Sequence, residues 1–353
     1  MMKPGICVAL VSFLAAFRLA PTHGRPAEGN RIQIEFDASE AEAVLAILDA
    51  KADSSDVPDV AWQRLFTSRP YTRLKKREES FPNGFTEEDF KAFVLSSGPS
   101  QRRLDLHHTL EAWRKADLTA VARRVLAYLP SDTIIRAHIY PVIKPQSNSF
   151  VFEAATDPAI FLYLNPDLTP ARFESKVAHE LHHIGLATVA PGAQQPPAGP
   201  AAAVRAAVEW MGSFGEGFAM LAAAGSPQVH PHAESDPADR MRWDRDMTNF
   251  NRDLKTLDGF FLDIIRGRLK TQDEIEQRGD SFYGVQGPWY TVGYKMAVAI
   301  ETTEGRAALV QCMVDAPRLL ATYNRAATAL NRRNKENLAL WSPDLLRLIA
   351  WPR

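Results

Sequence analysis

The sequence predicts an α+β fold that is mostly helical, with a small β-sheet next to one central helix and a helical C-terminal lobe. Strand-like patterns are few, and they gather in residues 133–164 with one more at 31–36. Apolar residues at helical spacing fill most of the remaining chain. Directly after the last strand pattern comes a marked helix that contains H-E-x-x-H, at His179, Glu180 and His183.

The 353 residues are enough for one large domain or two to three small ones. Hydrophobic residues make up 46% and charged residues 24%, which is ordinary for a globular protein. The net charge of -1 gives no electrostatic reason to expect a nucleic-acid partner. We expect a targeting segment at 1–24, a mainly helical N-terminal region at 25–130 and a core at 131–353.

The first 24 residues have the pattern of a secretory signal peptide. Lys3 precedes the apolar run from Ile6 to Phe17, and small or turn-forming residues continue to Gly24. The run is short for a membrane span, although an uncleaved anchor is the alternative. We therefore expect a secreted or periplasmic protein of a bacterial envelope, without stable membrane insertion after cleavage. Only Cys312 then remains, so no intramolecular disulfide is possible, and its apolar neighbours predict that it is buried.

The N-terminal region begins with a strand and continues with helices. Residues 31–36 alternate between apolar and polar side chains, which predicts a strand. Asp37 or Ser39 is suited to cap a helix at 40–48. Turn signals divide the following stretch into three predicted helical segments, at 58–78, 86–96 and 105–128.

The sheet continues after residue 132 with three predicted strands, at 133–142, 150–153 and 159–164. Asn165-Pro166-Asp167 ends the last of them, and the next helix begins at Pro170. An edge strand of this sheet could hold an extended substrate peptide by strand addition.

The H-E-x-x-H motif lies within a well-marked helix. Thr169 is a predicted N-cap, and Pro170 takes the first helical position. The helix has an apolar face, which predicts that it is anchored on a core: Phe173, Val177, Leu181 and Ile184.

The motif has the spacing of a zinc site. His179 and His183 are four residues apart and lie on one face of a helix, within reach of one Zn²⁺. Zinc lowers the pKa of a bound water to about 7. Glu180 is then the candidate general base that takes the proton of that water. His182 does not have the spacing to replace either histidine.

A catalytic zinc site has three protein ligands, so a third is needed. An Ala-rich helix predicted at 201–224 contains Glu209 and Glu216, and their spacing places both on one face. Gly215 and Gly217 flank Glu216, and glycine disfavours a helix, so its backbone is expected to approach another element closely. Glu216 is therefore the first choice and Glu209 the second. Two histidines in a later Pro-containing loop are weaker candidates: His230 and His232.

The remaining segments surround these helices. Residues 191–200 are rich in Pro, Gly, Ala and Gln, and they predict a mobile loop that is either a lid or a simple connector. Further helices are expected near 258–269, 304–331 and 343–350, with a break in the second at Pro317.

Hydrolysis also needs a hydrogen-bond donor for the developing oxyanion. A helix predicted from Pro288 to about Glu301 places Tyr290, Gly293 and Tyr294 on one face. We choose Tyr290, near the helix start, ahead of Tyr294. Aromatic packing in the core is the alternative role for both tyrosines.

H-E-x-x-H followed by E-G-[aromatic]-A on a later helix resembles the gluzincins, zinc metallopeptidases with two histidine ligands and one glutamate ligand. The resemblance implies a thermolysin-like core. Together with Tyr290-x-x-Gly293-Tyr294, these motifs are similar to a family of uncharacterised zinc-dependent bacterial peptidases, over about residues 130–300.

Some positions depart from related families. Leu186 and Val189 stand where metzincins need Gly and His, which excludes that clan. Met220 stands where thermolysin has an aspartate that orients a zinc histidine, so another group must orient the zinc ligands here.

The resulting hypothesis is an exported zinc peptidase with one Zn²⁺ per chain and a peptide or protein substrate. Two alternatives remain at this point. One is a non-catalytic binding protein whose helices are held together by zinc, and the other is a zinc hydrolase of a non-peptide amide. The sequence does not indicate the oligomeric state.

Overall fold

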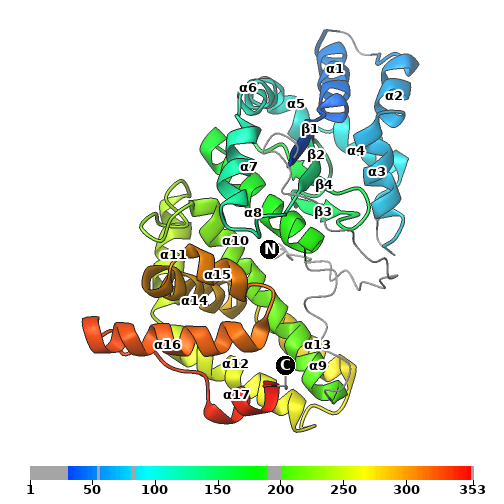
Figure 1. Ribbon diagram of the computed structural model, residues 1–353. Helices are drawn as coiled ribbons and strands as arrows, with labels where there is room; N and C mark the ends of the chain where they lie inside the picture. Colours follow the sequence, from blue (N-terminus) through cyan, green and yellow to red (C-terminus); the bar gives the residue numbers. More distant parts are fainter. Residues whose placement is uncertain (1–30, 54–55, 82–83, 190–200, 351–353) are drawn as a thin grey trace. The chain divides into compact units, whose positions relative to one another are not determined.

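The chain forms two units, which we describe separately (Figure 1). The computed structural model describes residues 31–53, 56–81, 84–189 and 201–350. Of these, the sheet unit contains those up to 122 and 134–184, and the helical unit contains 123–133 and those from 185 onward. The predicted signal peptide at 1–24 and loop at 191–200 lie outside the described residues. The predicted domain division near residue 130 stays a prediction.

The sheet unit is built on a four-stranded sheet with the order β1-β2-β4-β3. Its strands are β1 (Ile32–Phe36), β2 (Ile135–Val142), β3 (Phe150–Phe152) and β4 (Ala159–Tyr163), close to the four predicted strands. β1, β2 and β4 are parallel, and β3 pairs antiparallel with β4 at one edge. The central strands β2 and β4 are mostly buried, as their apolar composition requires, whereas the edge strand β1 alternates in exposure.

Helices surround this sheet (Figure 1). They are α1 (Ser39–Asp53), α2 (Asp59–Phe66), α3 (Arg69–Glu78), α4 (Glu87–Val94), α5 (Ser97–Gln101), α6 (Arg103–Arg114), α7 (Leu118–Leu126) and α8 (Pro170–Val189). The last two continue into residues of the helical unit. The predicted helix at 40–48 is therefore confirmed and is longer than expected.

The helical unit is centred on α14 (Pro288–Glu304), which packs against α10 (Gly215–Ala224), α12 (Phe250–Ile265), α15 (Arg306–Cys312) and α16 (Ala316–Asn334). Its other elements are α9 (Ala202–Met211), the 3-10 turn η2 (Gly212–Phe214), α11 (Pro237–Met247), α13 (Gln272–Ser281) and α17 (Pro343–Ile349). Trp289 of α14 is fully buried among aromatic rings that include Phe214 and Phe261. Cys312 is buried, as predicted.

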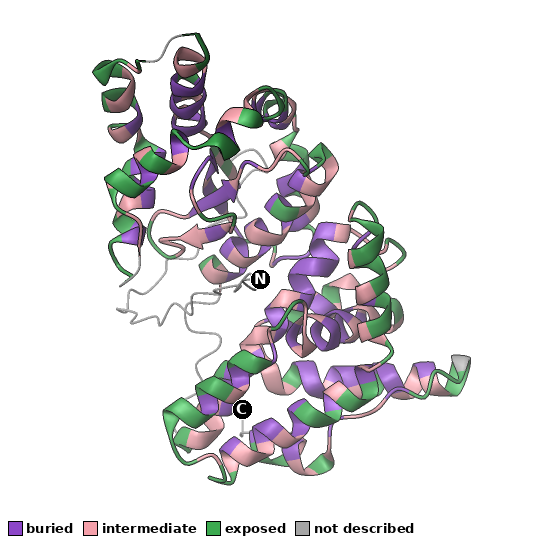
Figure 2. Ribbon diagram, turned by 180° about the vertical axis from the view of Figure 1, so that it is seen from behind, coloured by how far each residue is buried: buried purple, intermediate pink, exposed green. Residues whose placement is uncertain are grey.

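Buried residues line one face of most helices and exposed residues line the other, as amphipathic patterns require (Figure 2). No helix in the described ranges is long and apolar enough to cross a membrane. The structure is thus mostly helical with one small sheet, as the sequence predicts, while the more specific thermolysin-like core stays a prediction.

Four predicted helices are divided in the structure. The predicted helix 201–224 is interrupted by the 3-10 turn η2, which separates α9 from α10. The segment 58–78 is divided because Ser68 is extended and a new helix, α3, begins after it with Pro70 in its first turn. The segment 105–128 is divided because Asp117 accepts a hydrogen bond from the Ala120 amide at the start of α7. The segment 304–331 is divided near Pro317, as predicted: α15 ends at Cys312, α16 begins at Ala316, and Pro317 lies in the first turn of α16.

The sheet unit also contains a buried carboxyl group. Glu40, in the first turn of α1, is fully buried, and its Oε2 accepts a hydrogen bond of 3.0 Å from the Ile143 amide. Burial raises the pKa of Glu40 to about 8, although the Ile143 amide and Lys144 act in the opposite direction. Burial likewise lowers the pKa of Lys144 to about 8.

Glu40 should make the stability of the fold depend on pH. Between its ordinary pKa of 4.5 and about 8, the folded chain keeps a proton that the unfolded chain has lost. The contribution of Glu40 to stability is therefore lost as pH rises through this window. Glu40→Gln does not titrate and keeps an oxygen for the Ile143 amide. We expect the wild type to lose on the order of 1–3 kcal/mol relative to Glu40→Gln between pH 5 and 8. Urea unfolding of both proteins across this range measures the difference, and parallel stability curves would contradict the assignment.

Candidate metal centre

The motif-bearing helix α8 is anchored at its start. The Thr169 Oγ1 accepts a hydrogen bond of 3.3 Å from the Arg172 amide, and Pro170 opens the helix. Phe173 is fully buried, stacks on Trp113 of α6 at 4.3 Å between ring centroids, and meets Phe36 of β1 edge to face at 6.5 Å. The predicted N-cap and apolar face of this helix are thus confirmed, and they fix α8 against the sheet and α6.

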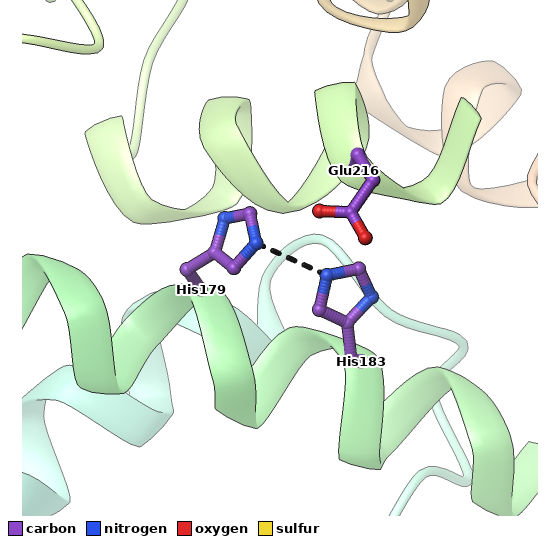
Figure 3. A group of neighbouring side chains, drawn as sticks. All are labelled: His179, His183 and Glu216. Atoms are coloured by element: carbon purple, nitrogen blue, oxygen red, sulfur yellow. Dashed lines mark hydrogen bonds between the residues drawn. The ribbon is translucent and has the colours of Figure 1, made fainter. Parts of the chain in front are cut away.

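His179 and His183 direct the same ring nitrogen toward each other. Their Nε2 atoms are 3.1 Å apart, and both side chains are half-buried (Figure 3). Their rings meet edge to face, with centroids 4.8 Å apart. His182 lies elsewhere on the helix and is fully buried. The four-residue spacing therefore brings the two predicted imidazoles together.

Glu216 lies in the first turn of α10, and the residue after it is pressed against α14. A Cβ atom added to Gly217 would lie 2.0 Å from the Tyr294 nitrogen and 2.5 Å from the Tyr290 carbonyl oxygen. The close backbone approach predicted from the glycines is thus confirmed at Gly217. It is not found at Gly215, where an added Cβ would lie 4.0 Å from a methyl carbon of Leu186, an ordinary van der Waals distance.

Within the described part of the chain, one group of three or more His, Cys, Asp or Glu side chains is arranged so that it could hold a metal. It consists of His179, His183 and Glu216, whose ligand atoms all lie within 4.8 Å of one another (Figure 3). Two imidazole nitrogens and one carboxylate oxygen are a typical ligand set of catalytic zinc. Tetrahedral zinc places two nitrogen ligands about 3.3 Å apart, close to the 3.1 Å between the Nε2 atoms. These residues therefore fit a zinc ion.

Comparison with known proteins gives one match. Residues 62–332, more than half of the chain, match the model of a family described as "putative zinc dependent peptidase (DUF5700)". The chain belongs to this family. Searches among curated proteins and among solved structures found no match. The similarity to uncharacterised zinc-dependent peptidases that the motifs indicated is thus confirmed. The description of the family supports a zinc-dependent peptidase in general terms. The assignment to the gluzincins stays a prediction.

The other ligand candidates of this zinc-peptidase family member lie outside the metal-ligand group. Glu209 is exposed on α9. The His230 Nε2 lies 2.9 Å from an oxygen of Asp244. The His232 Nδ1 lies 2.9 Å from the Ser235 hydroxyl. Of the four candidates for the third ligand, the structure therefore places Glu216 with the two motif histidines. Glu180 is half-buried on α8, directly after His179.

The two candidate tyrosines of α14 differ in their surroundings. Tyr294 is buried, its ring meets Trp243 edge to face at 5.4 Å, and its hydroxyl donates to the Val229 carbonyl at 3.5 Å. Burial raises the pKa of Tyr294 to about 12. These contacts favour a packing role for Tyr294. Tyr290 is half-buried, and its carbonyl lies beside Gly217.

A third tyrosine near Glu216 was not singled out from the sequence. The Tyr283 hydroxyl lies 2.9 Å from the Ser213 hydroxyl, and Ser213 precedes Glu216 by three residues. Seventy residues separate Ser213 from Tyr283, and Tyr283 lies between two helices without any motif. No local pattern in the sequence could have indicated this contact.

Proposed function

We propose that this chain is an exported zinc-dependent peptidase, in which His179, His183 and Glu216 hold one zinc ion and Glu180 is the general base. The observation that carries the proposal is the three-residue ligand group on a member of a zinc-peptidase family. Such a ligand set leaves a fourth position for water or substrate, which is the arrangement of catalytic zinc sites and not of closed structural ones.

When bound, zinc supplies a Lewis acid that polarises the scissile carbonyl and makes a water ligand more acidic. Glu180 accepts one proton from the attacking water as the new bond from oxygen to the carbonyl carbon forms. Glu180 then returns this proton to the leaving nitrogen as the C–N bond breaks. The second proton of the water passes from the new carboxyl group to the amine, so the products are one carboxylate and one ammonium, and Glu180 regains its starting state.

Two further features are suited to a peptide substrate. The Tyr290 side chain is the proposed hydrogen-bond donor to the carbonyl oxygen as it gains negative charge. The strand β3 forms one edge of the sheet and pairs only with β4 among the described strands. Its outer edge is therefore the proposed place for strand addition by an extended peptide.

The mature enzyme is proposed to act in the periplasm or outside the cell. This follows from the signal-peptide pattern of residues 1–24. The net charge of -1 gives no electrostatic reason to propose a nucleic-acid partner.

Cleavage of a peptide library by the purified mature chain tests the proposal. We expect cleavage in the presence of zinc, its loss after chelation and its return when one equivalent of zinc is restored. The cut sites would also distinguish an endopeptidase from an exopeptidase. A chain that binds zinc stoichiometrically and cleaves no peptide would contradict the proposal, and would favour a non-peptide amide substrate or a structural zinc.

The choice of third ligand has a direct test. Glu216→Ala is expected to weaken zinc binding at least about tenfold, because it removes one of three protein ligands. Glu209→Ala, seven residues earlier and exposed, is the matched control and is expected to bind zinc like the wild type. Competition with a chromophoric chelator measures both affinities. If Glu216→Ala bound zinc as tightly as the wild type, Glu216 would not be the third ligand. A loss of zinc affinity in Glu209→Ala would make Glu209 the third ligand instead.

A further inference from the structure

Ser213 and Tyr283 form a hydroxyl pair on the side of the helix that carries Glu216. Ser213 lies in the 3-10 turn η2, which continues into the first turn of α10. Residues three apart lie on one side of such a turn, so Ser213 and Glu216 share a face. The Tyr283 hydroxyl reaches this face and lies 2.9 Å from the Ser213 Oγ.

The hydrogens of this pair can be counted. Each hydroxyl carries one hydrogen, and one of the two is used in the bond between Ser213 and Tyr283. The second hydrogen is left for another acceptor. A carboxylate that binds a metal through one oxygen is usually hydrogen-bonded as well, and this contact orients it. Met220, one turn further along α10, has no hydrogen to donate.

We propose that Ser213 and Tyr283 are positioning residues that donate this second hydrogen to the carboxylate of Glu216 and fix its orientation as a metal ligand. The inference rests on the proposed zinc centre. It assigns the residues that orient the Glu216 ligand, which the sequence does not reveal. In this role the pair acts as one unit, because neither hydroxyl is held in place without the other.

The surroundings of Tyr283 agree with this role. Tyr283 is half-buried, so its hydrogen bonds are partly shielded from water. Burial raises the pKa of Tyr283, the Ser213 bond lowers it, and the negative charge of Glu216 raises it again. The phenol and the Glu216 carboxylate are therefore close enough to interact electrostatically.

The loop after Tyr283 is held in a restricted conformation. Gly284 and Gln286 have φ angles of 48° and 62°, and positive values are uncommon for a residue such as glutamine. The Gly287 amide donates to the Tyr283 carbonyl at 2.6 Å. The neighbouring Trp289 indole donates to the Gly279 carbonyl at 2.9 Å. A positive φ at a residue such as Gln286 persists where the surrounding structure enforces it, so the loop that follows Tyr283 has a defined conformation.

Zinc affinity is the quantity that tests the pair. We expect Ser213→Ala and Tyr283→Phe each to weaken zinc binding by about 10- to 100-fold in a chelator competition assay. The double variant is expected to lose no more than the larger single loss, because the two hydroxyls act together. Ser213→Thr keeps the hydroxyl and is expected to keep most of the affinity.

Tyr323→Phe is the matched control. Tyr323 lies in the same helical unit as Tyr283 and is buried, and its hydroxyl donates to the Ala339 carbonyl at 2.8 Å. This variant is expected to melt at a lower temperature than the wild type and to bind zinc equally well. Thermal melts of all variants without zinc show whether each is folded.

The outcomes separate this inference from the proposed function. Wild-type affinity in Ser213→Ala and Tyr283→Phe, or losses that add in the double variant, would overturn the pair and leave the zinc centre intact. A wild-type chain that binds no zinc would overturn the proposed centre itself. Weakened binding in folded single variants, without further loss in the double variant, would support the pair.

Discussion

Replacing Glu180 with glutamine is expected to slow peptide cleavage by at least about 10²-fold, the lower range for general acid–base catalysis, while zinc binding stays at the wild-type level. Glutamine has nearly the size of glutamate, but its amide cannot accept a proton near pH 7. Glu180 does not belong to the group of side chains that could hold the metal. The substitution should therefore remove proton transfer and leave the ligands in place.

Glu174→Gln is the matched control for this experiment. Glu174 lies on the same helix, α8, is also half-buried, and is outside the ligand group. Its substitution makes the same chemical change and should leave kcat and zinc content unaltered. Glu180→Gln that cleaves as fast as the wild type would show that another group is the base. Loss of zinc from Glu180→Gln would instead indicate that Glu180 takes part in metal binding.

The sequence predicted the parts of the structure that short-range patterns determine. The four strands were found because turn residues bound them, because β4 is a continuous apolar segment, and because apolar residues alternate with polar ones at the start of β2. The α8 helix was found because an N-cap, a proline and an apolar face agree with one another. Glu216 was preferred over Glu209 because of its flanking glycines, and Gly217 does meet backbone atoms of α14.

Two helices were missed because they contain few apolar residues, so no apolar face at helical spacing marks them in the sequence. The predicted elements do not include α11 or α13, and both are strongly polar helices with few buried residues. For α13 a capping box was present in the sequence: the Thr271 hydroxyl accepts from the Glu274 amide, and the Glu274 carboxylate accepts from the Thr271 amide. For α13, the capping residues in the sequence therefore mark the start of the helix, whereas the spacing of apolar residues does not.

Contacts between distant segments are beyond local patterns. The burial of Glu40 depends on the end of β2, which follows it by about one hundred residues. The pairing of Ser213 with Tyr283 likewise depends on how α13 and the following loop pack in the helical unit. In both cases the polar side chain has an ordinary sequence context, and only tertiary structure gives it an unusual environment.

Gly217→Ala is expected to have the largest effect on stability among substitutions near the proposed centre. The added Cβ would lie 2.0 Å from the Tyr294 nitrogen, 2.4 Å from the Gly293 carbonyl carbon and 2.5 Å from the Tyr290 oxygen. All three are backbone atoms of α14, which cannot rotate away as a side chain can. The helices α10 and α14 must therefore separate, and overpacking of this kind typically costs about 1–3 kcal/mol.

The same substitution should weaken zinc binding, because Glu216 precedes Gly217 on the helix that has to move. Thermal or urea unfolding of the zinc-free chain measures the stability change, so that loss of metal does not contribute to it. Zinc titration at a temperature where the variant is still folded then measures the change at the ligand.

Gly259→Ala separates the two effects that alanine has in a helix. Alanine is favoured over glycine within a helix by about 1 kcal/mol. Gly259 lies within α12, and a Cβ added there would meet nothing within 4 Å. Gly259→Ala should therefore stabilise the chain, and the difference between the two variants gives the cost of the close approach at Gly217. If Gly217→Ala instead raised stability as much as Gly259→Ala, α10 and α14 would not be in contact through their backbones. Glycine at position 217 would then have no role in placing Glu216.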